Sequence, residues 1–231
     1  MLNYKKNKDI LIEKLEHVKH LYLMPGMAAS PAIFEYLNFL HPIKMHLLSW
    51  ILPHKKEPFA HYAERMCSFV KHPDPILLGV SFGGLVVQEM AKIVNAEKVV
   101  IVSSIKSNKE MPNHMRMAHQ TNAHKLLPVQ WMKSFDSLAT FAFGKGIQKR
   151  LDLYKKYLSV RDPDYLRWAI NTMVHWDQET PQEDILHIQG NKDMVFPVKN
   201  LQEPFHCIEG GHAMIINKAR WFNKNLPELL L

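Results

Sequence analysis

The stretch ILLGVSFGGLVV, Ile76 to Val87, places a single serine between glycines and flanking apolar runs. The run before the serine is short and apolar, as in a buried strand, and the residues from Gly83 onward have a helical pattern. A side chain at such a strand-to-helix junction sits on a sharp turn and projects above the sheet. Gly79 and Gly83 suit this turn because a Cβ atom at either position is expected to collide with a neighbouring strand or helix. Ser81 is therefore a candidate reactive residue.

A serine at this junction also has a candidate stabiliser of negative charge beside it. The amide of Phe82 is predicted to lie at a helix N-terminus, where unpaired N–H groups and the helix dipole favour an anion. A serine hydroxyl is a poor nucleophile at neutral pH, and it needs a base together with a group that orients that base. The junction therefore predicts a nucleophile elbow and directs attention to histidines and carboxylates farther along the chain.

Short apolar runs alternate with helical patterns along most of the sequence. Several runs are apolar on both alternating faces, which is typical of a parallel sheet covered by helices on both sides. The runs expected to form strands are His20–Met24, Met45–Ile51, Pro75–Val80, Lys98–Val102, Ile185–Gln189 and Phe205–Ile208. The helical patterns are Pro31–Leu40, Phe59–Val70, Gly83–Val94 and Ala213–Asn225. The alternation predicts an α/β fold with a mostly parallel, doubly wound sheet of about six strands and helices on both faces.

The 231 residues are long enough for one sizeable core and are expected to form one domain, residues 1–231. Between about 110 and 183 there is no convincing strand, and helix-like runs carry many methionines and aromatic residues. We expect this segment to be a helical cap, inserted after the fourth strand and lining a cleft with apolar side chains. The residues before the first strand fit a helix better than a strand, although an edge strand stays an alternative.

Taken together, these features resemble the alpha/beta hydrolase fold family, in its capped serine hydrolase or esterase type. The resemblance covers nearly everything from about His20 to Leu226. In that family the nucleophile is followed in sequence by an acid and then a histidine, each on a loop after a later strand. HIQGNKDMVFP places Asp193 in a loop similar to the family's acid loop, and EGGH places His212 after the last strand. The resemblance implies a catalytic triad of Ser81, Asp193 and His212.

The family takes its second oxyanion donor from the loop after the first strand of this core. In this sequence the loop reads LMPGMAAS, so the backbone amide of Met27 is the candidate beside that of Phe82. The family usually has a histidine before the loop glycine, where this chain has Pro25. Only a backbone N–H is required, so the departure leaves the proposed role of Met27 intact. The first and third strands would be neighbours at the switch point of the sheet, which brings Met27 beside Ser81.

The resemblance implies hydrolysis of an ester or thioester through an acyl-serine intermediate. An apolar cap favours a small-molecule substrate of small to medium size with a hydrophobic acyl or alcohol part. Acyl transfer and carbon–carbon bond hydrolysis use the same triad, so these reactions stay open as alternatives. A ligand-binding receptor that turns over slowly or not at all is a further alternative on the same fold.

Composition argues against several other classes of partner. The net charge is +7, but the basic residues are scattered rather than gathered with aromatic residues, so no nucleic acid partner is expected. The two cysteines lack metal-ligand spacing. The spacing of His114, His119 and His124 turns each about 140° from the last on a helix. We therefore expect neither a metal nor a cofactor.

No apolar stretch approaches the roughly 18 residues that would span a bilayer. The first residues are interrupted by charge where a signal peptide would have its apolar segment. The sequence thus predicts a cytoplasmic protein with no membrane partner.

Overall fold

A computed structural model describes residues 18–40, 42–121 and 155–231. These residues form a six-stranded parallel sheet with the order β2-β1-β3-β4-β5-β6. Its strands are β1 (Lys19–Met24), β2 (Ile43–Leu47), β3 (Ile76–Val80), β4 (Lys98–Val102), β5 (Ile185–Gly190) and β6 (His206–Ile208). The strand order reverses between β1 and β3, and this switch point is where α/β sheets bind their ligands. The predicted α/β class and the mostly parallel sheet of about six strands are confirmed.

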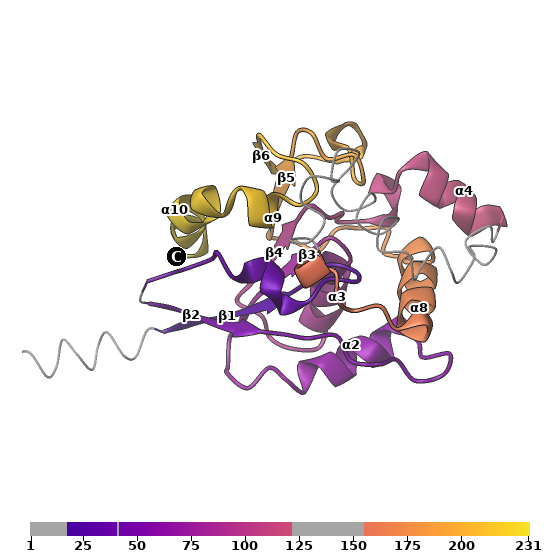
Figure 1. Cartoon of the computed structure of the whole chain (residues 1–231), viewed down its shortest axis with the longest axis horizontal. Coiled ribbons are helices and arrows are strands. Elements are labelled where there is room, and N and C mark those ends of the chain that lie inside the picture. The colour runs from indigo at the N-terminus through magenta and orange to yellow at the C-terminus, as the bar shows by residue number, and fades with distance from the viewer. Residues whose placement is uncertain (1–17, 41, 122–154) are drawn as a thin grey trace, which may run out of the picture.

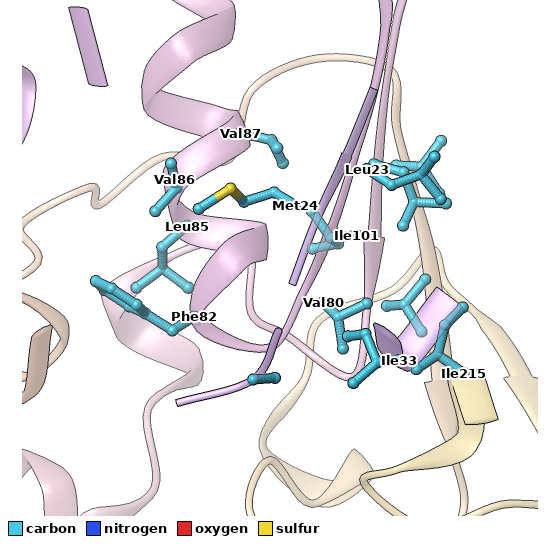
Figure 2. Close-up of a cluster of buried hydrophobic side chains, with 14 of the residues drawn as sticks. Leu23, Met24, Ile33, Val80, Phe82, Leu85, Val86, Val87, Ile101 and Ile215 are labelled. Carbon is cyan, nitrogen blue, oxygen red and sulfur yellow. The ribbon is translucent and has the colours of Figure 1, made fainter. Parts of the chain in front are cut away.

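Helices cover both faces of the sheet (Figure 1). One face carries α2 (Phe59–Cys67) and α3 (Phe82–Ala91), whereas the other carries α9 (Met214–Asn217) and α10 (Ala219–Leu230). The alternation of side chains along β1 divides the core in the same way. In Figure 2, Met24 lies on the side of α3 near Leu85 and Val86, and Leu23 lies on the opposite side of the strand.

Burial on both faces explains why the central strands read as continuous apolar runs. All residues of β3 are buried, and those of β4 are buried after Lys98. Strands enclosed in this way leave their carboxyl ends as the exposed edge on which polar residues can gather. The first polar residue beyond β3 is Ser81.

The structure corrects one predicted helix. The segment Pro31–Leu40 forms only a short 3-10 helix, η1 (Pro31–Phe34), rather than an α-helix. Its turns are closed by bonds between residues three apart, from the Glu35 amide to the Ala32 carbonyl and from Leu37 to Phe34. The amide of Asn38 then donates to the side chain of Asn223 on α10 instead of to a preceding turn. The chain therefore packs against α10 at this point, and the helix does not continue.

Other boundaries also differ from the prediction, and α2 and α3 each end three residues earlier than expected. The strand predicted over Met45–Ile51 begins and ends earlier, as β2, because the chain leaves the sheet after its last bond, from the Leu48 amide to the Leu23 carbonyl. The helix predicted over Ala213–Asn225 is divided at Lys218, whose φ of −120° and ψ of 24° are not helical. The second part, α10, runs on to Leu230 and buries Phe222, Leu226 and Leu230.

The segment predicted as a cap is described in part. It contains the end of the 3-10 helix η2 (Asn108–Glu110), then α4 (Asn113–Thr121) and α8 (Pro163–Val174), and no strand among its described residues. Figure 1 shows α8 beside α2. The ring centroids of Trp168 on α8 and Tyr62 on α2 are 4.2 Å apart. The stretch 122–154, with most of the aromatic residues assigned to the cap, lies outside the described residues, as do residues 1–17. No helix in the described part of the chain has the length and apolar character needed to cross a bilayer.

Candidate active site

Ser81 occupies the sharp turn between β3 and α3. Its φ of 54° and ψ of −122° lie in a region that a residue with a Cβ atom rarely adopts, so the turn is strained. The turn is held by bonds on both sides, since the Ser81 amide donates to the Val102 carbonyl and the Ser104 hydroxyl donates to the Ser81 carbonyl. This geometry lifts the Ser81 side chain off the carboxyl end of β3.

The elbow glycines are required by close backbone contacts. A Cβ atom at Gly79 would lie 2.2 Å from the carbonyl oxygen of Gly83, and one at Gly83 would lie 2.4 Å from that of Pro25. Real Cβ atoms do not approach other atoms so closely. The collisions with a helix and with the end of a neighbouring strand are those expected from the sequence.

The structure brings the three residues expected to form a triad into one hydrogen-bonded line. Nε2 of His212 lies 3.0 Å from Oγ of Ser81. On the other side of the ring, Nδ1 lies 2.9 Å from Oδ2 of Asp193. In the neutral imidazole, Nδ1–H would donate to the carboxylate, which leaves the Nε2 lone pair facing the serine hydroxyl.

The carboxylate of Asp193 is buried and well supported. Its Oδ1 accepts bonds from the amides of Val195 (2.8 Å) and Phe196 (3.0 Å). Burial by itself would raise the pKa of this carboxyl, but the charge of His212 and the hydrogen bonds from His212, Phe196 and Val195 outweigh burial and lower the pKa. The site therefore holds an ionised acid behind the imidazole.

A second layer of polar side chains, which the sequence reasoning missed, fixes the acid. The amide nitrogen of Gln189 donates both to Oδ2 of Asp193 (2.9 Å) and to the Phe196 carbonyl (2.7 Å). Both partners are acceptors, so the Gln189 oxygen must face Nε2 of His187, 3.2 Å away, and that nitrogen must carry a proton. His187 and Gln189 sit two residues apart on β5 and share a face of the sheet. Their alternation with apolar residues in ILHIQG was the available signal.

The loop after β5, which carries Asp193, and the loop after β6, which carries His212, contact each other through their backbones. A Cβ atom at Gly190 would lie 2.4 Å from the Gly210 carbonyl oxygen, so neither loop could approach the other with a larger residue at position 190. The contact is closed by bonds from the Lys192 amide to the Gly210 carbonyl and from the Asn191 amide to the Ile208 carbonyl. This contact positions Asp193 and His212 together.

The loop after β1 lies against the elbow. A Cβ atom at Gly26 would come 3.4 Å from the Ser81 Cβ. The loop turns with Ala28 at a φ of 64°, and the Gly26 carbonyl accepts bonds from the Ala29 amide and the Trp50 indole. Met27 is thus carried on a braced turn beside Ser81, and its amide remains a candidate oxyanion donor.

The amide of Phe82 is at the first position of α3, where helical N–H groups have no intrahelical acceptor. The Phe82 side chain is fully buried and packs near the rings of Trp50 (5.4 Å), Phe59 (5.9 Å) and Trp168 (6.0 Å). Because this packing holds the Phe82 side chain in place, its backbone amide stays beside Ser81. Trp168 comes from α8, so aromatic side chains of the predicted cap reach the elbow.

Comparison with known proteins agrees with this geometry at the level of the fold. The sequence matches no protein-family model and no curated protein. A hydrolase from Pseudomonas aeruginosa PA01 superimposes with a TM-score of 0.68 at 14% identity, covering 92% of this chain and 90% of that one. A thermophilic esterase from Thermogutta terrifontis gives 0.66 at 12% identity, covering 92% and 89%. The chain has the alpha/beta hydrolase fold.

A third solved structure with this fold is the enol-lactonase from Burkholderia xenovorans LB400, with a TM-score of 0.65 and 12% identity. The match covers 93% of this chain and 92% of that one. At such identities the likeness is one of architecture. The alpha/beta hydrolase fold therefore accounts for the sheet and its crossovers, and the chemistry must be argued from Ser81 and its neighbours.

Proposed function

We propose that this chain is a serine hydrolase that cleaves an ester or thioester through an acyl-serine intermediate. The observation that carries the proposal is the continuous line from the Ser81 hydroxyl through His212 to the buried carboxylate of Asp193. A strained serine, a base within hydrogen-bonding distance and an acid that orients the base are the parts that nucleophilic acyl transfer requires.

In the acylation step, Oγ of Ser81 attacks the substrate carbonyl carbon while Nε2 of His212 takes the hydroxyl proton. The oxyanion that forms would be stabilised by the amides of Phe82 and Met27. When it collapses, the bond to the leaving alkoxide or thiolate breaks, and His212 returns the proton to that group. Asp193 holds the tautomer and stabilises the imidazolium during the transfer.

In the deacylation step, water takes the place of the leaving group. His212 accepts a proton from the water as its oxygen attacks the acyl carbon. Breakdown of the second tetrahedral intermediate releases the carboxylic acid and returns the proton to Oγ of Ser81. The step consumes one water for each ester bond and restores the starting enzyme.

The substrate class follows from the surroundings of the elbow. Phe82, Trp50 and Trp168 form an aromatic cluster that begins at the residue after Ser81. This favours an uncharged acyl or alcohol part of small to medium size. Two of the solved structures with this fold are named as an esterase and an enol-lactonase, both ester-cleaving activities, which supports the same class.

A fluorophosphonate probe tests the nucleophile directly, because it forms a phosphorus–oxygen bond to an activated serine with loss of fluoride. We expect one label per chain on the peptide containing Ser81, and labelling slowed by several orders of magnitude in His212→Gln. Ser68→Ala is the matched control, because Ser68 is exposed directly after α2 and its hydroxyl donates to the Arg65 carbonyl, far from the triad. Folded protein that takes no label, or takes it at another serine, would refute the assignment.

A series of p-nitrophenyl esters of increasing acyl length separates hydrolysis from binding alone. The proposal expects turnover of the short and medium esters, with an optimum that reports the space available to the acyl chain. Labelling of Ser81 without turnover of any ester in the series would favour a ligand-binding receptor or a more specialised triad reaction.

A further inference from the structure

Three histidines gather on the face of the sheet beneath α2, away from Ser81. The register pairs Tyr22 of β1 with His46 of β2 and His20 with Lys44, so the side chains of His20, Tyr22 and His46 share one face. His72, on the connection between α2 and β3, stacks on His20 with ring centroids 3.5 Å apart. No other group of three potential metal-ligating side chains comes this close in the part of the chain that the structure describes.

Each of the three rings offers a nitrogen to the same small volume. The three nitrogens lie within 4.8 Å of one another, and Nδ1 of His20 is 2.8 Å from Nε2 of His46. Two nitrogens bound to the same tetrahedral Zn²⁺ are about 3.3 Å apart, from Zn–N bonds of about 2.0 Å. The His20–His46 contact therefore has to open by about half an ångström, and the stacked rings have to tilt until their lone pairs converge.

We propose that His20, His46 and His72 together bind one divalent transition-metal ion of the kind that prefers imidazole nitrogen, with Zn²⁺ as the representative. Three neutral imidazoles suit Zn²⁺, Cu²⁺ or Ni²⁺ rather than Mg²⁺ or Ca²⁺, which require oxygen ligands. A site with three protein ligands leaves a fourth position for water or a small anion.

The surroundings of His20 and His46 disfavour the charged form of both rings. Burial, followed by the neighbouring His72 and the charge of Lys44, lowers the pKa of His20. Burial, the other two histidines and Lys44 lower the pKa of His46 in the same way. One of the two facing nitrogens of His20 and His46 carries the proton of their hydrogen bond, so metal binding requires that proton to move to the other nitrogen of its ring.

Tyr22 supplies the outer support that metal-bound histidines usually have. Its hydroxyl oxygen lies 2.6 Å from Nδ1 of His72 and accepts a bond from the Lys71 amide at 2.9 Å. In the tautomer that carries the proton on Nδ1, His72 donates to the tyrosine oxygen and leaves Nε2 as the ligand. The bond to Tyr22 orients His72, which is the one proposed ligand that does not lie on a strand.

An open hollow of about 400 Å³ adjoins two of the three histidines, His46 and His72, and Tyr22 also lines it. It gives an ion a path of entry and gives room for the fourth ligand. In the sheet, Tyr22 is paired with Leu77 of β3, which lies four residues before Ser81. Four residues of a strand span about 13 Å, so the histidines are about that far from Ser81 along the strand direction. A bound ion would therefore tie β2 and the connection before β3 to β1, and would not act on the ester bond.

The test uses the full chain, freed of metal with a chelator and titrated with Zn²⁺ by calorimetry. We expect one saturable equivalent per chain, a rise in Tm with added Zn²⁺, and loss of that equivalent in His46→Gln and in His72→Gln. His206→Gln is the matched control, since His206 is exposed on β6 and belongs to no such group. Tyr22→Phe is expected to keep the site and weaken it about 10- to 100-fold.

Cobalt gives a readout that does not depend on stability. Co²⁺ bound by three imidazoles and one further ligand should show the visible absorption bands of a tetrahedral ion, absent in His72→Gln. His72 is the safest position to change, because it lies outside the strands. Wild-type protein with no saturable Zn²⁺ equivalent, or an equivalent retained in both histidine variants, would overturn the proposal.

Discussion

The carboxyl edge of β3, β5 and β6 and the face formed by β1 and β2 both gather ionisable side chains, but the two regions arrange them in opposite ways. At the carboxyl edge, a hydroxyl, an imidazole and a carboxylate follow one another, and each is bonded to a group unlike itself. On the β1–β2 face, three imidazoles meet with no carboxylate among them, and the charge of Lys44 acts on His20 and His46. Unlike groups in line can move a proton in one direction, whereas like neutral donors around one point can collect a cation.

The two regions also differ in what surrounds them. The acid at the carboxyl edge is buried and held by Gln189 and two backbone amides. The three histidines are only partly buried, and His46 and His72 open to a hollow. A proton-transfer site gains from exclusion of water, whereas a metal site needs a route for the ion. The following predictions separate the two regions by experiment.

The largest expected effect comes from Ser81→Ala, which removes the proposed nucleophile and leaves the histidine face untouched. We expect kcat with a p-nitrophenyl ester to fall by about 10⁶-fold, as when a triad serine is removed. Zinc binding should persist in the same preparation. Turnover close to the wild-type rate would show that another group carries the reaction.

Asp193→Asn tests whether the carboxylate orients His212. An amide in place of the carboxylate favours the wrong tautomer, so we expect kcat to fall by about 10⁴-fold with the fold retained. Asp164→Asn, at an exposed residue of α8 that pairs with Arg167, provides the control and should stay within about twofold of wild type. Equal rates for the two variants would argue against a triad.

The third prediction concerns pH and a histidine of the outer layer. Burial lowers the pKa of His187 to about 4, from a usual 6.5. Because the unfolded chain binds this proton more readily, the stability that His187 contributes is complete above pH 6.5 and declines as the pH falls toward 4. The loss amounts to about 3 kcal/mol at pH 4.

Urea unfolding at several pH values measures this loss. In His187→Gln the slope of stability between pH 6.5 and 4 should become shallower, since the substituted amide does not titrate. An unchanged slope would assign the acid sensitivity to other groups.

The smallest expected effect concerns stability and compares two glycines of the carboxyl edge. Gly79→Ala places a methyl group 2.2 Å from the Gly83 carbonyl oxygen, whereas at Gly211 the nearest atom would be 3.7 Å away. We expect Gly79→Ala to destabilise the fold by about 1–3 kcal/mol and Gly211→Ala to have much less effect. Chemical denaturation of both variants checks the difference, and similar losses would mean that the elbow relaxes more easily than its contacts indicate.

The features that can be predicted from the sequence alone are those whose constraint is local. Gly79, Ser81 and Gly83 belong to one turn, and the apolar runs of β1 and β3 to β5 show burial without any knowledge of their partners. Asp193 and His212 were found because the family resemblance gave their order. Their contact itself depends on Gly190 meeting Gly210, which is a tertiary feature.

What the sequence could not show depends on register and on packing partners. The helix expected from Pro31 ends early because Asn38 bonds to Asn223, far along the chain. The support of Asp193 by Gln189 and His187 looks like ordinary strand alternation until β5 is in place. The helical spacing of His114, His119 and His124 argued against a metal site there, whereas His20 and His46 meet only through the pairing of β1 with β2, and His72 joins them from the connection before β3.

The most direct test of the central claim is to quench the protein in acid during turnover of p-nitrophenyl butyrate and to weigh the intact chain and its peptides. The account predicts a population carrying one butyryl group, on the peptide that contains Ser81, and its accumulation when deacylation is slower than acylation. Rapid ester turnover with an acyl group found on another residue, and never on Ser81, would contradict it.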